Sequence, residues 1–77
     1  MNAAQLELGQ KATVIGIRAD ESNRLRMIQM GVTAHAPIRI VKRAPLGDPL
    51  ELEIRGYRVC LRKAQAESIL VHTEAEQ

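Results

Sequence analysis

The strongest constraint on the fold is a stretch of alternating residues, LELEIRGYRVCL, at positions 50–61. Apolar and polar side chains alternate in both halves of this stretch, which is the period of a half-buried strand. Arg55 and Gly56 lie between the halves, where a two-residue hairpin turn is expected. We therefore predict a β-hairpin with its apolar side chains on one face, whose register pairs Ile54 with Tyr57, Glu53 with Arg58, Leu52 with Val59, and Leu50 with Leu61.

A strand and a helix are predicted near the start of the chain. Residues 11–18, KATVIGIR, are rich in β-branched side chains and predict a strand with a bend or bulge at Gly16. Asp20 or Ser22 can cap a helix of about three turns, and Gly31 supplies the left-handed residue that ends it.

The remaining elements complete a mainly β pattern. Residues 37–43 predict another strand, because Pro37 is tolerated at the first position of a strand. After the hairpin, KAQAESI predicts one helical turn and residues 69–71 a closing strand. Five short strands with one short helix inserted after the first strand indicate a small β-barrel. We expect residues 1–77 to form one domain, with residues 72–77 as a frayed tail.

Composition limits the functions that are open to this domain. Among 77 residues there is one Tyr and neither Phe nor Trp, so the core is aliphatic and base stacking on aromatic side chains is excluded. A single Cys forms no internal disulfide, which indicates a reducing compartment. The sequence has neither a signal peptide nor an apolar run long enough to span a bilayer, so we expect a cytoplasmic protein.

The basic residues give only a weak electrostatic signal. The net charge is +2, and 11 basic residues are spread among nine acidic ones. Phosphate binding needs clustered charge, so we expect no nucleic-acid binding. Five residues around the helix and the following strand are either solubilising surface or a patch that docks an acidic partner through Arg26, Arg39 and Arg43; the five are Arg24, Arg26, Arg39, Lys42 and Arg43.

No catalytic constellation is present in the sequence, so we expect a protein that is not an enzyme. The chain lacks the phosphate-binding loop of a GTPase. Cys60 lies between Arg58 and Arg62, which favour a reactive thiolate. A lone cysteine is more often a small buried residue, however, and we expect Cys60 to be packed. Cys60, His35 and His72 are weak candidates for binding iron or zinc, because none belongs to a pair with ligand spacing, and we expect both histidines at the surface.

The loop before the hairpin, APLGDP at residues 44–49, combines restricted and flexible residues. Pro45 and Pro49 restrict φ, whereas Gly47 allows a sharp reversal. Asp48 can accept hydrogen bonds from backbone amides two residues further on. Such a loop keeps one shape, and we predict that all five residues from Pro45 to Pro49 contact a partner. Leu46, its only large apolar side chain, is expected to be exposed.

Four groups of residues follow one another in a recognisable order: Arg26, Met27, Met30 and Gly31; then APLGDP; then Gly56, Val59, Leu61 and Arg62; and finally Ala66, Ile69 and Val71. In this order the chain resembles the FeoA family of small SH3-like β-barrels that assist ferrous iron transport. The resemblance covers roughly residues 6–72. One position departs from the family pattern, because Ala34 and His35 stand where Pro-Gly is common, and we expect the loop after the helix to be built differently.

The resemblance implies a cytoplasmic accessory protein that binds the FeoB-type membrane transporter and its GTP-binding domain at the inner face of the membrane. Similar barrels also form the C-terminal domains of some iron-dependent repressors. A regulatory SH3-like domain that binds protein or nucleic acid therefore stays open as a second interpretation. Self-association through an exposed strand edge is compatible with both interpretations.

Overall fold

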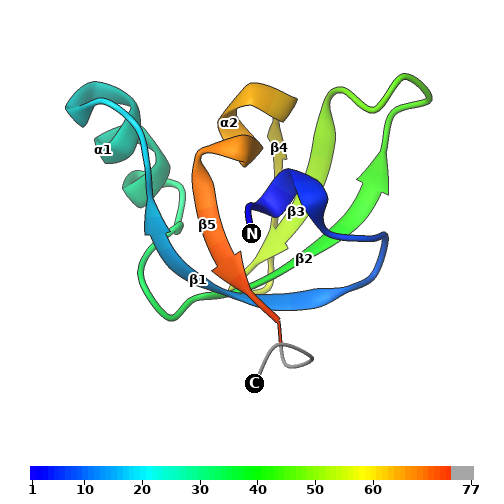
Figure 1. Cartoon of the computed structure of the whole chain (residues 1–77), viewed down its shortest axis with the longest axis horizontal. Helices are drawn as coiled ribbons and strands as arrows, with labels where there is room; N and C mark the ends of the chain where they lie inside the picture. Colours follow the sequence, from blue (N-terminus) through cyan, green and yellow to red (C-terminus); the bar gives the residue numbers. More distant parts are fainter. Residues whose placement is uncertain (74–77) are drawn as a thin grey trace.

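A five-stranded antiparallel sheet with the order β4-β3-β2-β1-β5 is the framework of the computed structural model, which describes residues 1–73 (Figure 1). The strands are β1 (Lys11–Ile17), β2 (Pro37–Arg43), β3 (Leu50–Ile54), β4 (Tyr57–Leu61) and β5 (Ile69–His72). The helices are the 3-10 turn η1 (Ala3–Gln5), α1 (Glu21–Gln29) and α2 (Lys63–Glu67). The predicted mainly β fold with a helix after the first strand is confirmed.

The hairpin of β3 and β4 has the predicted register in all of its pairs. Arg55 and Gly56 have positive φ angles of 51° and 85°, as the type I′ turn requires. The prediction of a common apolar face fails at Tyr57, which is 76% exposed because it lies at the turn end of an edge strand.

Charged residues on the solvent face of the hairpin make side-chain contacts that the register alone does not predict. Glu53 and Arg58 lie opposite each other in the register, but Glu53 Oε1 accepts a hydrogen bond from Arg39 Nη2 of β2 at 2.9 Å. Arg58 instead lies 3.5 Å from Glu51. The predicted position of Glu53 opposite Arg58 is confirmed, but the hairpin sequence does not reveal that Arg39 of β2 is the other neighbour of Glu53.

The strand β1 contains the irregularity that was predicted at Gly16. Its register against β5 shifts between Val14 and Gly16, and a bulge of this kind bends a strand. The first part of β1 consequently pairs with β2 and the second part with β5. The sheet curls without closing, because β4 and β5 are its two edges. The predicted barrel is therefore an open one.

The N-terminal segment and α2 lie between the two edges of the curled sheet (Figure 1). Ala3, Leu6 and Ala66 are each at most 1% exposed there. Val71 N donates a hydrogen bond to Met1 O at 2.8 Å, so the N-terminal segment also covers part of the edge of β5. The sequence analysis predicts no helical turn in this region, so η1 was missed.

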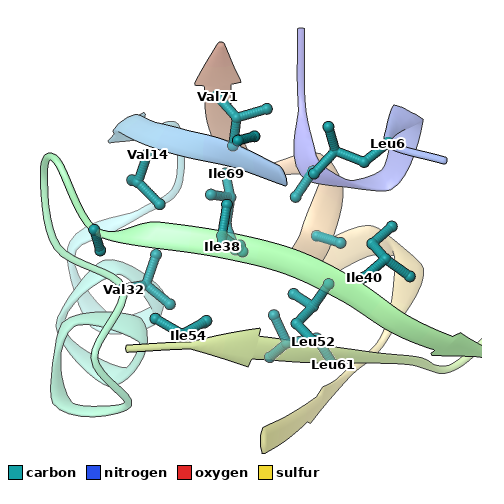
Figure 2. Close-up of a cluster of buried hydrophobic side chains, with 14 of the residues drawn as sticks. Leu6, Val14, Val32, Ile38, Ile40, Leu52, Ile54, Leu61, Ile69 and Val71 are labelled. Atoms are coloured by element: carbon teal, nitrogen blue, oxygen red, sulfur yellow. The ribbon is translucent and has the colours of Figure 1, made fainter. Parts of the chain in front are cut away.

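Aliphatic side chains meet on the inner face of the sheet, as the composition predicts. Figure 2 shows the cluster, which includes Leu6, Val14, Val32, Ile38, Ile40, Leu52, Ile54, Leu61, Ile69 and Val71. The strand β5 extends to His72, which pairs with Thr13, and Thr73 is only 4% exposed. The predicted frayed tail therefore does not begin at residue 72, and positions 74–77 lie outside the described residues.

The helix α1 begins and ends as predicted. Asn23 N donates to Asp20 Oδ1 at 2.8 Å, so Asp20 is the cap. Gly31 has a φ of 98°, which the chain needs in order to leave the helix. Met27 is the buried residue of α1, whereas Leu25 and Ile28 are exposed. None of the helices within residues 1–73 is long and apolar enough to cross a membrane.

Candidate partner-binding site

The loop at residues 44–49 connects β2 to β3 and projects at one end of the sheet (Figure 1). Ala44 N donates to Pro49 O at 3.1 Å across the base of the loop. Gly47 N donates to Ala44 O at 2.7 Å, which closes a tight turn inside it. Gly47 has a φ of 84°, a conformation that favours glycine. The backbone of the loop is therefore fixed by its own hydrogen bonds.

Asp48 ties the loop to α2. Its Oδ1 accepts a hydrogen bond from the N–H of Lys63, the first residue of α2, at 2.8 Å. The prediction that Asp48 would bind an amide two residues further on is wrong, because the short helix after the hairpin offers an unsatisfied N–H in the same place. Hydrogen bonds therefore hold the loop at its base, between Ala44 and Pro49, and also against α2, through Asp48.

Leu46 lies at the tip of this fixed loop and is 96% exposed. The predicted exposure of Leu46 is confirmed. Pro45 and Asp48 are also exposed, whereas Gly47 and Pro49 are half-buried. A nearly fully exposed leucine on a restrained backbone loses little conformational entropy when a partner covers it.

A hollow of about 200 Å³ lies beside the loop and is lined by Lys42, Ala44, Pro49, Glu51 and Cys60. Cys60 is exposed, so the prediction that it is packed is wrong. Its position in β4 explains the difference, because Cys60 lies opposite Glu51, whose neighbours Leu50 and Leu52 are the residues of β3 that face the core. Leu46 is thus a protruding apolar side chain and the hollow is a recess beside the same loop, and a partner can contact both.

The structure does not bring the three predicted arginines together. Arg26 lies on α1, and Figure 1 shows this helix at the opposite end of the molecule from the loop. Arg39 of β2 pairs with Glu53. Arg43 Nη2 donates to Ala4 O at 3.2 Å and to Leu6 O at 3.0 Å, so it fastens the N-terminal segment to the sheet.

The weak metal candidates also lie apart in the fold. His35 is exposed in the loop before β2, His72 is half-buried in β5, and Cys60 is on β4. Residues 1–73 contain no group of three or more His, Cys, Asp or Glu side chains that could hold a metal ion. His35 has a φ of 69°. Histidine thus takes here a left-handed conformation that glycine adopts more readily, and the expectation of a differently built loop stays a prediction.

The curled sheet, the helix after its first strand and the projecting loop define a small domain with an SH3-like fold. The FeoA domain model matches residues 1–73. The chain therefore belongs to the FeoA family.

A curated relative and two solved structures of FeoA proteins support this assignment. The chain is 32% identical over 71 residues to the Fe(2+) transport protein A/Fe(2+) transporter FeoB fusion protein of Porphyromonas gingivalis. This alignment covers 92% of the chain but only 8% of the relative, so the chain spans less than a tenth of that protein. The solution structure of Chlorobium tepidum FeoA matches with a TM-score of 0.91 and 32% identity, covering 100% of this chain and 73% of that one.

Two further structures place the fold. The crystal structure of Stenotrophomonas maltophilia FeoA complexed with zinc, described as a prokaryotic SH3 domain protein, matches with a TM-score of 0.83 and 25% identity, over 94% of this chain and 89% of that one. A manganese-dependent transcriptional repressor matches with a TM-score of 0.85 over 95% of this chain and 41% of its own. At 20% identity, the repressor shares the fold with this chain.

Proposed function

We propose that this chain is a non-enzymatic accessory module that binds an FeoB-type ferrous iron transporter through the loop at residues 44–49. The observation that carries the proposal is Leu46, 96% exposed on a loop that hydrogen bonds hold at its base and at α2. In the Porphyromonas gingivalis relative, the transport protein A and FeoB parts share one polypeptide, which supports FeoB as the partner. The module then works in the cytoplasm, at the inner face of the membrane.

Replacing Leu46 with aspartate tests this proposal. Leu46 is almost fully exposed, so the free energy of unfolding of Leu46→Asp should stay within about 0.5 kcal/mol of the wild type. Binding to the purified transporter should be lost, because a charged side chain would be desolvated at the contact. Pull-down of the transporter and thermal unfolding are measured on the same preparation.

A matched control is Leu25→Asp, which adds the same charge at an exposed leucine of α1, at the other end of the molecule. This variant should keep the interaction. Normal transporter binding by Leu46→Asp, or an equal loss with both variants, would contradict a role for the loop.

The repressor-like fold supports a second candidate function, a regulatory domain that binds nucleic acid. Titration of the chain with duplex and single-stranded oligonucleotides at low and high salt separates the two functions, since phosphate binding weakens steeply with salt. We expect weak binding, because residues 1–73 offer Tyr57 as the sole aromatic side chain for stacking.

Direct binding of iron or zinc to this chain is a separate matter. The zinc in the Stenotrophomonas maltophilia structure belongs to that protein. In this chain, we propose that any contact of His35, His72 or Cys60 with a metal is weak, because the three side chains lie on separate elements.

A further inference from the structure

The outer face of the sheet carries a row of charged side chains across four adjacent strands. The register places Lys11 of β1 opposite Arg39 of β2, Arg39 opposite Glu53 of β3, and Glu53 opposite Arg58 of β4. Directly opposite residues of antiparallel strands project from the same face. The row therefore reads positive, positive, negative, positive, on the side of the sheet away from the core.

This row leaves positive charge without a partner. Arg39 donates to Glu53 at 2.9 Å, but Lys11 lies opposite Arg39, and like charges directly opposite each other destabilise a sheet. The Nε of Arg39 is buried and has no hydrogen-bond partner among the described residues. An anionic group placed here would relieve the repulsion between Lys11 and Arg39 and could accept from the exposed part of the Arg39 guanidinium, whose side chain is 37% exposed.

Two hollows lie next to Arg39, and this residue lines both of them. One has a volume of about 260 Å³ and is lined by Lys11, Ala12, Pro37, Ile38, Arg39, Glu53, Arg55 and Gly56. The other has a volume of about 390 Å³ and is lined by Leu8, Gly9, Arg39, Ile40, Val41 and Arg58. We call the two hollows together the Arg39 groove. Its walls carry four cationic side chains and one carboxylate, with the exposed Leu8 at one side.

We propose that the Arg39 groove binds an extended acidic peptide segment of a partner protein. One carboxylate of the segment lies in the hollow between Lys11, Arg39 and Arg55, and a second faces Arg58. An apolar side chain of the same segment covers Leu8, which is 65% exposed. This proposal does not depend on the role of Leu46 or on the identity of the transporter.

The dimensions of the groove fit a peptide. Neighbouring strands are about 4.8 Å apart, so the row from β1 to β4 spans about 14 Å. An extended chain advances about 3.3 Å per residue, and about four or five residues cover this length. A nucleic acid fits less well, because phosphates repeat along its whole backbone and some of them would face Glu51 and Glu53, whereas a peptide can place its carboxylates opposite the cationic side chains only.

The test measures binding of a fluorescein-labelled peptide in which leucine alternates with pairs of Asp or Glu. Fluorescence anisotropy should show saturable binding that weakens with salt. A peptide with Asn and Gln in place of the acids should not bind. Amide chemical shifts in NMR spectra should change most at the residues lining the groove. Equal binding of the amide peptide, shift changes confined to other surfaces, or tighter binding of a single-stranded oligonucleotide would overturn the proposal.

Lys11→Glu separates binding from stability. The substitution replaces a like-charge pair by an opposite-charge pair with Arg39, so the melting temperature should stay the same or rise. Affinity for the acidic peptide should fall by about tenfold or more, because the new carboxylate repels the ligand. Lys11→Gln, which keeps a neutral polar side chain at this position, should weaken binding by a smaller factor.

Arg24→Gln on α1 is the control for net charge, because Arg24 is exposed and lies outside the groove. It should leave the peptide affinity close to that of the wild type. If Arg24→Gln and Lys11→Gln weaken binding equally, the attraction comes from overall charge, and the groove is not a binding site.

Discussion

Replacing Asp48 with alanine tests how the candidate loop is held in place. The Asp48 carboxylate accepts the N–H of Lys63 at 2.8 Å, at the first residue of α2. Loss of such a cap acceptor destabilises a helix by about 0.5–2 kcal/mol. We expect Asp48→Ala to lower the free energy of unfolding by about 1 kcal/mol, because Asp48 is exposed and α2 is short. In a domain of this size, that corresponds to a fall in melting temperature of about 4–8 °C.

Hydrogen exchange at one amide makes the test specific. The Lys63 amide should exchange faster in Asp48→Ala, because its acceptor is gone. Asp48→Asn is the matched control, since its side-chain oxygen can still accept the bond, and it should recover most of the stability. An unfolding free energy for Asp48→Ala equal to the wild-type value, or an equal loss in Asp48→Asn, would refute the reasoning that this bond fixes the loop.

Two further predictions concern other fixed points of the fold. Arg43→Ala removes the hydrogen bonds to Ala4 O and Leu6 O, so urea denaturation should show a loss of about 1–3 kcal/mol, and unchanged stability would contradict the tether. His35→Gly removes the strain of a non-glycine residue at a φ of 69°, and after the entropy cost of glycine we expect a gain of about 0.5 kcal/mol. The control Ala36→Gly should lower the stability, because Ala36 is buried. A loss of stability in both variants would show that the backbone of His35 is not strained.

The sequence was sufficient to predict the local elements. Alternation over residues 50–61 predicted every pair of the hairpin, because the two-residue turn fixes the register. Asp20 or Ser22 was predicted to cap α1 and Gly31 to end it, for an equally local reason, since caps act within a few residues, and Asp20 is the cap that the structure has. The exposure of Leu46 also followed from its place in a short loop.

Features that depend on long-range neighbours could not be predicted in this way. The Asp48–Lys63 bond joins residues 15 apart, and Arg43 reaches the N-terminal segment only because the sheet curls. The hydrogen bond between Arg39 and Glu53 was not predicted for the same reason, since β2 lies beside β3 on the side away from β4. The prediction that Cys60 is packed was wrong, because the alternation of side chains along β4 directs Cys60 to solvent. A general preference of cysteine for burial does not change which face of the strand the residue is on.

The two proposed contact surfaces lie next to each other. Glu51 lines the hollow beside the loop, Arg58 lines the Arg39 groove, and the two side chains are 3.5 Å apart. One partner can therefore cover the hollow beside the loop and also place an acidic segment in the groove. Because the second contact then forms within the same complex, its effective concentration is high, and two weak contacts give a stronger association. The loop contributes apolar area and the groove contributes charge complementarity, which selects the partner and its orientation more than it adds affinity.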